Sequence, residues 1–177
     1  MLSTNDAPDV AIATTLAEPV QRYKRIDHIA FAVRDLESAV ALFEGVLGFN
    51  LVRRLQIRGK KTGMISAELE HNGMKFVLCQ GTEPDSQVSQ LIDSHGPGVA
   101  HIALEVDDPH QLTKELAERG LSFDTSVIDG PGLTQVFSSR CSNSGASFEF
   151  IARTSEEGFL EENVQQLFEQ LEHSGKY

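Results

Sequence analysis

The sequence predicts an α+β protein in which one βαβββ module occurs twice. The motif His-Ile-Ala-x-x-Val-x-Asp begins at His28 and again at His101, 73 residues later. Each copy leads into a helical segment that ends at a glycine, and a Gly-x-x-Phe motif follows in both copies, at Gly73 and Gly145, 72 residues apart. This period is too long for a solenoid of small repeats. We therefore expect two modules that share one core.

Local patterns define the first module, which begins at Tyr23. Alternating apolar residues predict strands over 25–33, 49–57, 63–70 and 74–80, and His71-Asn72-Gly73 is a hairpin signal between the last two. Asp35 has the position of an N-cap for a helix that ends at Gly48, because apolar residues recur there every three or four positions. A short helix is expected in the connection 82–95.

The second module repeats this plan. Strands are predicted over 99–106, 121–127, 133–138 and 147–153, with a helix over 109–119 that Asp108 caps. An amphipathic helix is predicted over 159–172. We expect residues 1–22 to form a mobile tail and 23–177 to form a single domain. Its modules span about 23–82 and 97–153, its sheet curves like a barrel, and a closing helix covers about 156–173.

The amino-acid composition argues against several classes of binding partner. With 40% hydrophobic residues and no long apolar run, the chain is expected to be a soluble protein. A net charge of −11 argues against nucleic acid or an anionic membrane as a partner. Cys79 and Cys141 have no metal-binding or redox spacing, and the first residues lack the features of a secretory signal. The expected location is the cytoplasm, and two-module chains of this type are expected to form homodimers.

Three residues at repeat-related positions form a candidate metal site. His28 matches His101, and Glu149 lies in the last strand, where an unpartnered charge would be costly. Its match in the first module is Val77, which cannot coordinate a metal. Two imidazoles and one carboxylate suit a divalent metal with open positions, as in non-haem Fe(II) oxygenases. Two structural histidines and a surface glutamate remain the alternative.

These residues also carry a family resemblance. The double module resembles the vicinal oxygen chelate superfamily, and residues from about 26 to 173 resemble the catalytic half of the 4-hydroxyphenylpyruvate dioxygenases. The matching segments are Gly96–Ala103, Thr134–Ser138, Phe148–Arg153 and the spaced pattern from Gly158 to Glu169.

The resemblance implies an Fe(II)-dependent dioxygenase that oxidatively decarboxylates and oxygenates a 2-oxo acid with O2. His28, His101 and Glu149 would bind Fe(II), and Co, Ni or Zn could replace it in a crystal. Gln135, Phe137, Val164 and Phe168 would contact the substrate, the last two from the closing helix.

Departures from the family pattern concern the substrate. Ala100 replaces a glutamine before the second histidine, Cys79-Gln80-Gly81 replaces Asn-Glu-Pro, and Val164 replaces a phenylalanine. We expect a 2-oxo acid other than 4-hydroxyphenylpyruvate, with a smaller or aliphatic side chain. The alternatives are a metal-dependent epimerase or isomerase of the methylmalonyl-CoA epimerase type, and a ligand-binding member of the superfamily without turnover. The epimerase would need a fourth ligand near Val77 and a carboxylate base, for which Glu68 is the one candidate.

Overall fold

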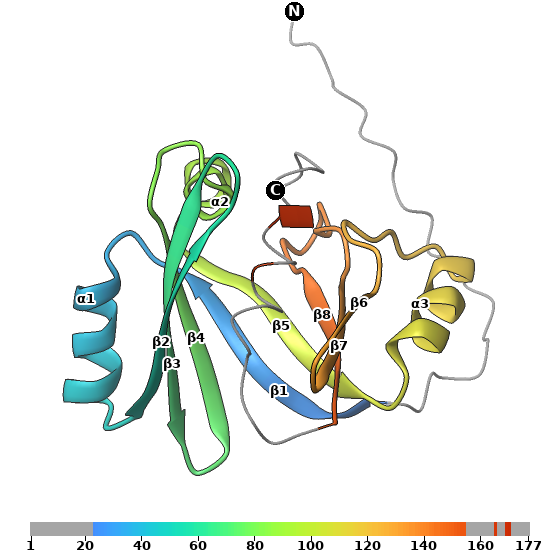
Figure 1. Ribbon diagram of the computed structural model, residues 1–177, viewed down its shortest axis with the longest axis horizontal. Coiled ribbons are helices and arrows are strands. Elements are labelled where there is room, and N and C mark those ends of the chain that lie inside the picture. Colours follow the sequence, from blue (N-terminus) through green and yellow to red (C-terminus); the bar gives the residue numbers. More distant parts are fainter. Residues whose placement is uncertain (1–22, 155–164, 166–168, 171–177) are drawn as a thin grey trace, which may run out of the picture.

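The computed structural model describes residues 23–154, 165, 169 and 170, and its centre is one curled sheet of eight strands (Figure 1). The first module contains β1 (Tyr23–Ala32), α1 (Leu36–Val40), η1 (Ala41–Val46), β2 (Asn50–Arg58), β3 (Gly63–His71) and β4 (Met74–Gly81). After the connecting helix α2 (Gln87–His95), the second contains β5 (Gly98–Val106), α3 (Pro109–Glu118), β6 (Ile128–Gly130), β7 (Leu133–Phe137) and β8 (Phe148–Arg153). The predicted α+β class and the doubled βαβββ order are confirmed.

The strand order reflects the internal repeat. It runs β2-β3-β4-β1-β5-β8-β7-β6, so the two modules meet where β1 pairs antiparallel with β5. Each of these central strands also pairs parallel with the last strand of its own module, β1 with β4 and β5 with β8. The two strands that carry the histidine motifs therefore lie side by side at the centre of the sheet.

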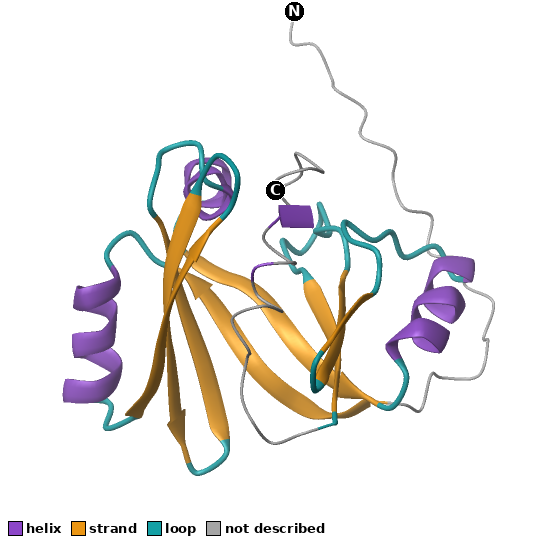
Figure 2. Ribbon diagram, in the orientation of Figure 1, coloured by secondary structure: helices purple, strands orange, loops and turns teal. Residues whose placement is uncertain are grey.

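The helices α1 and α3 cover the outer face of the sheet (Figure 2). Leu36 and Val40 of α1 pack on buried residues of β3 and β4. Leu112 and Leu116 of α3 pack on Phe150 and other residues of the second module. Because side chains alternate along a strand, the neighbours of these apolar residues face the inside of the curl. The candidate site lies there.

Both predicted helix caps are present. The side chain of Asp35 accepts a hydrogen bond from Ser38 N, and that of Asp108 accepts one from Gln111 N, with Pro109 in the first turn. The first helix differs from the prediction after Val40, because its remaining six residues form a π-helix. It ends as expected before Gly48, whose φ of 78° suits glycine.

The predicted strand over 121–127 is wrong. This segment makes one isolated bridge, between Phe123 and Ser138, and the strand β6 begins only at Ile128. The hydroxyl of Thr125 accepts the hydrogen bond of Phe137 N, in the place where a strand partner would offer a carbonyl. A side chain thus replaces the regular ladder, while Phe123 and Val127 still pack against the core beside α3.

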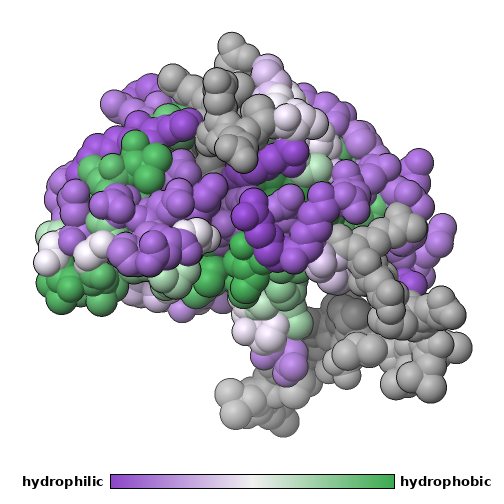
Figure 3. Space-filling model, turned by 90° about the horizontal axis from the view of Figure 1, so that it is seen from below, coloured by the Kyte–Doolittle hydropathy of each residue, from purple (hydrophilic) through white to green (hydrophobic). Residues whose placement is uncertain are grey.

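The surface is mixed in character. Figure 3 shows a mostly hydrophilic underside on which apolar residues form separate patches. Exposed apolar side chains include Leu42, Val46 and Leu47 at the end of the first helical segment. Among the described residues, no helix combines the length and apolar character that a membrane crossing requires.

Candidate metal centre

Three strands bring the predicted ligands together inside the curl. His28 lies on β1, His101 on β5 and Glu149 on β8. In the sheet, Ala103 is the neighbour of both His28 and Glu149, and it is completely buried. Its short side chain leaves room for the two longer ones to meet above it, which is how residues 121 positions apart come into contact.

The three ligand atoms form a nearly equilateral triangle. His28 Nε2 lies 3.3 Å from His101 Nε2, and Glu149 Oε2 lies 3.2 Å from His28 Nε2 and 3.3 Å from His101 Nε2. Ligands at 90–110° around an ion with bonds of about 2.1 Å are separated by about 3.0–3.4 Å. The triangle therefore has the size of one face of a divalent metal's coordination shell.

The burial of the Glu149 and His28 side chains is also consistent with a metal site. Glu149 is completely buried and His28 is 2% exposed, so Glu149 is not a surface residue. Neither carboxylate oxygen of Glu149, both of them buried, has a hydrogen-bond partner among the described residues. Oε2 makes ion-pair contacts with the two histidines. An ionised carboxylate in such a place needs a positive partner. A divalent cation beside the two imidazole nitrogens would supply it.

The charges in this centre shift the pKa values of its own groups. Burial lowers the pKa of His28, but the charges of Glu149 and Asp27 outweigh burial and raise this pKa to about 9. Burial raises the pKa of Glu149, but His28 and His101 outweigh it and lower this pKa to about 2. Burial lowers the pKa of His101, against the opposing effect of Glu149. A neutral His101 and an ionised Glu149 are the forms that bind metals.

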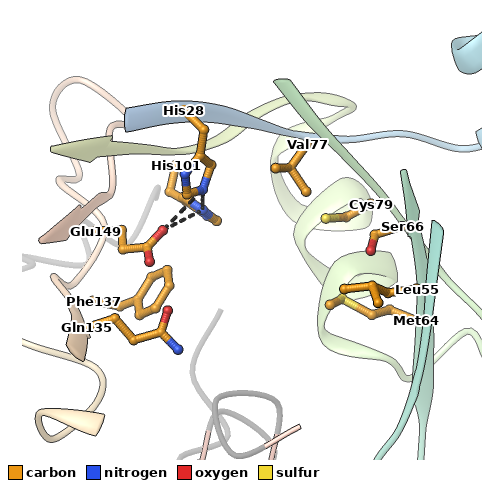
Figure 4. A pocket seen from close by; sticks show the side chains of 10 residues that line it. All are labelled: His28, Leu55, Met64, Ser66, Val77, Cys79, His101, Gln135, Phe137 and Glu149. Carbon is orange, nitrogen blue, oxygen red and sulfur yellow. Dashed lines mark hydrogen bonds and ion pairs between the residues drawn. The ribbon is translucent and has the colours of Figure 1, made fainter. Parts of the chain in front are cut away.

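The triad lies at one side of a cavity of about 430 Å³, a volume that includes its open mouth. Gln135 and Phe137 of β7 lie next to Glu149 in Figure 4, and the ring of Phe137 meets that of His101 edge-on, with ring centroids 5.1 Å apart. These two predicted substrate contacts are thus beside the triad. Val164 and Phe168, also predicted to contact the substrate, lie outside the described residues.

The opposite side of the cavity comes from β2, β3 and β4 and was not predicted as a site. Figure 4 shows these side chains facing the triad across the cavity: Leu55, Met64, Ser66, Val77 and Cys79. Four are apolar or weakly polar, and Ser66 adds one hydroxyl. The sequence contains no local signal for this wall, because the curl of the sheet brings it opposite the triad.

A buried ion pair lies next to the triad and was also not predicted. Asp27 accepts hydrogen bonds from His28 and from Arg153 of β8, and its side chain is completely buried. Burial raises the pKa of Asp27, but the bonds from Arg153 and His28 outweigh burial and hold the pKa well below its ordinary range. Asp27 is therefore an ionised carboxylate that contacts a predicted ligand.

The fold agrees with comparisons to known proteins. The profile of the Glyoxalase/Bleomycin resistance protein/Dioxygenase superfamily matches residues 25–141, and the chain belongs to this superfamily. Among its curated relatives is the 4-hydroxyphenylpyruvate dioxygenase of Pseudomonas aeruginosa, 28% identical over 83% of this chain and 51% of that protein. The mitochondrial methylmalonyl-CoA epimerase of Bos taurus is 27% identical over 58% of each chain.

Solved structures show the same fold. A mutant of 4-hydroxymandelate synthase from Streptomyces coelicolor superposes with a TM-score of 0.77 at 23% identity, covering 88% of this chain and 55% of that one. A methylmalonyl-CoA epimerase from the same organism gives a TM-score of 0.65 at 23% identity, covering 77% of this chain and 99% of that one. The chain spans about half the length of the curated dioxygenases that it matches.

Proposed function

We propose that the protein is a non-haem Fe(II) dioxygenase whose substrate is a 2-oxo acid. The observation that carries the proposal is the triangle of His28, His101 and Glu149, with Val77 at the fourth repeat-related position. Two histidines and one carboxylate on one face of an ion leave the opposite positions open. The similarity to 4-hydroxyphenylpyruvate dioxygenase from Pseudomonas aeruginosa supports the same reaction class.

Each part of the site has a separate task in this proposal. Bound Fe(II) would supply the open coordination positions for a 2-oxo acid and O2, and the 2-oxo acid, oxidised with loss of CO2, would be the reductant of O2. His28, His101 and Glu149 hold the ion on preformed strands, so little reorganisation accompanies binding. Gln135 offers its amide group to the polar end of the substrate, and Phe137 fixes the His101 ring. The apolar wall keeps water away from the reacting groups.

The cavity wall favours a substrate with an uncharged side chain. Leu55, Met64 and Val77 present hydrocarbon and thioether surface toward the triad. A charged side chain placed against this wall would lose its hydration without gaining a partner. We infer that the substrate points its carboxylate and keto oxygens at the triad and an uncharged side chain at β2 and β3.

One observation favours the epimerase alternative. Glu68 of β3 lies directly across from Val77 in the β3–β4 ladder, is nine-tenths buried, and its Oε2 atom has no hydrogen-bond partner among the described residues. A buried carboxylate oxygen without a hydrogen-bond partner is a candidate to accept a proton from a substrate. However, Glu68 is not among the residues that line the cavity, and Val77 supplies no fourth ligand. These two features favour the dioxygenase.

Oxygen consumption distinguishes these functions. The metal-free protein, loaded with Fe(II) without air, is given a panel of 2-oxo acids in an oxygen electrode, and CO2 release is measured in parallel. We expect equal amounts of O2 consumed and CO2 released with at least one uncharged 2-oxo acid, and no consumption by Glu149→Gln. Exchange of a substrate α-proton with solvent deuterium, equally fast without O2 and with Co(II), would establish the epimerase instead. Binding of a 2-oxo acid without either reaction would establish a ligand-binding protein.

A further inference from the structure

The ion pair of Asp27 and Arg153 lies beside His28, and the role assigned to it below rests on the proposed metal centre. Consecutive residues of a regular strand point to opposite faces of the sheet. Asp27 and His28 nevertheless are both buried, because the pairing of β1 with β5 shifts register between Ile26 and His28. This bulge brings the carboxylate of Asp27 to the imidazole of the next residue. Bulges beside functional sites often redirect a side chain in this way.

The bonds of Asp27 fix which nitrogen of His28 faces the centre. Asp27 Oδ1 lies 2.9 Å from His28 Nδ1. An ionised carboxylate only accepts hydrogen bonds, so Nδ1 must carry the hydrogen and donate it. The Nε2 atom is then the one that points at His101 and Glu149, with its lone pair available once its proton is released. A carboxylate that holds the far nitrogen of a ligand histidine sets the tautomer and the ring orientation.

Arg153 in turn fixes Asp27. Its Nε donates to Oδ2 and its Nη2 to Oδ1, both at 2.8 Å. The guanidinium and the carboxylate therefore form a bidentate ion pair, called the two-bond clamp below. This bidentate pairing fixes the orientation of the Asp27 carboxylate as well as its distance, which a lysine cannot do. Arg153 lies four residues after Glu149 on β8, on the same face of that strand. One strand therefore supplies both a metal ligand and the clamp that orients a ligand on another strand.

We propose that Asp27 and Arg153 are positioning residues of the metal centre: the two-bond clamp of Arg153 holds Asp27 so that His28 presents Nε2 to the ion. Metal affinity then depends on Arg153, although this side chain acts only through Asp27. Loss of such a partner typically weakens metal binding by about 10- to 100-fold. The weakening requires no change in the three ligands themselves.

The test measures Co(II) affinity in four proteins by titrating the metal-free form in competition with a coloured chelator. Asp27→Asn keeps the shape of the Asp27 side chain and removes its charge. Arg153→Lys keeps the positive charge and removes the two-bond clamp. The matched control is Arg25→Lys, because Arg25 also pairs with a carboxylate between neighbouring strands, Glu105 at 2.6 Å, but on the exposed surface. We expect about 10- to 100-fold weaker binding for Asp27→Asn, about 10-fold weaker for Arg153→Lys, and an unchanged value for the control.

Spectra separate positioning from a general loss of structure. In the Zn(II)-loaded wild type, a ¹⁵N-labelled histidine spectrum is expected to show a protected Nδ1–H for His28, and Asp27→Asn is expected to lose it. The visible absorption of bound Co(II) is expected to change in both variants, while Arg25→Lys keeps the wild-type spectrum. Should Asp27→Asn unfold, Arg153→Lys decides alone.

The outcomes distinguish this proposal from the proposed function. If the wild type binds one Co(II) and both variants match its affinity within twofold, the positioning role is overturned while the metal centre stands. If the wild type binds no metal, both are overturned. If the Asp27 and Arg153 variants bind Co(II) more weakly but keep the wild-type Nδ1–H signal and Co(II) spectrum, the positioning role is also overturned, since the His28 ring would then be correctly oriented without the ion pair.

Discussion

At the scale of single residues, the centre is a group of charges kept out of water. His28 and Glu149 are almost completely buried, and without a metal the proton on His28 is the nearest partner of the Glu149 carboxylate. The same three side chains thus form either an ion pair with a neutral imidazole or a ligand set for a cation. Metal ions and protons compete for this position.

This competition predicts a pH dependence of stability for the metal-free protein. The pKa of His28 is about 9 when folded and about 6.5 when unfolded, so its stabilising effect is complete below pH 6.5 and disappears as the pH rises through 9. We expect the free energy of unfolding to fall by about 3 kcal/mol over this range. Urea unfolding at several pH values measures it. Glu149→Gln is expected to make the free energy of unfolding depend less on pH. The control His110→Ala removes an exposed histidine and is expected to keep the wild-type pH dependence. An equal fall in Glu149→Gln would contradict the assignment of this pH dependence to His28.

The cavity wall predicts substrate selectivity. Met64→Ala shortens the wall opposite the triad and is expected to shift kcat/KM toward 2-oxo acids with longer side chains by about 10-fold or more. Competition between two 2-oxo acids that differ in chain length measures the shift. Met74→Ala is the matched control because Met74 is half exposed at the hairpin. An equal preference in both variants would show that Met64 does not limit the side chain of the substrate.

At the scale of elements, the described residues of the C-terminal segment connect the two edges of the sheet. Gln165, Glu169 and Gln170 are helical, as predicted for the closing helix. Gln165 Nε2 donates to the carbonyl of Arg58, the last residue of the edge strand β2, at 2.8 Å. Ser126, two residues before the other edge strand, donates to Gln170 Oε1 at 3.1 Å. Gln165 and Gln170 therefore contact opposite ends of the curled sheet, one at β2 and the other near β6.

Truncation tests whether the segment protects the reaction. A chain that ends after Arg153 keeps all three metal ligands, so iron binding is expected to stay within about threefold of the wild type. Loss of these contacts is expected to admit water and reduce the amount of product formed per O2 consumed. Oxygen consumption and product are measured together, and Phe168→Ala is expected to give a smaller effect. Full coupling in the truncated chain would show that the segment stabilises the fold without closing the site.

The elements also show what the sequence could predict. Strands and caps followed local rules, and the repeat indicated His28, His101 and Glu149 as candidate ligands, which the structure brings within 4.8 Å of one another. The prediction of a strand over 121–127 was wrong. The hydroxyl of Thr125 accepts the hydrogen bond of Phe137 N in place of a backbone carbonyl, and no local sequence pattern indicates this. Asp27 was missed as a site residue because strict alternation would place it opposite His28, and the bulge depends on the partner strand. The wall formed by Leu55 and Met64 depends on the curl of the sheet.

At the scale of the whole molecule, the proposed metal centre lies between the two modules. His28 belongs to the first module, and His101 and Glu149 to the second, so a bound ion would connect them across the β1–β5 pair. A ligand that binds only the folded state stabilises it by about 2.7 kcal/mol at 100 times its Kd. For a chain of this length we expect Tm to rise by about 5–11 °C. Calorimetry with Co(II) measures the rise, and an equal rise in His101→Ala would place the ion elsewhere.

The metal content of the purified chain and of its ligand variants tests whether His28, His101 and Glu149 bind an ion. After anaerobic loading with Fe(II) and removal of excess metal, elemental analysis is expected to find one iron per wild-type chain and per His110→Ala chain. His28→Ala and His101→Ala are expected to retain less than about a tenth of this amount while circular dichroism shows an intact sheet, because the ligands lie on a preformed structure. Full iron content in both ligand variants would contradict a metal centre built from His28, His101 and Glu149.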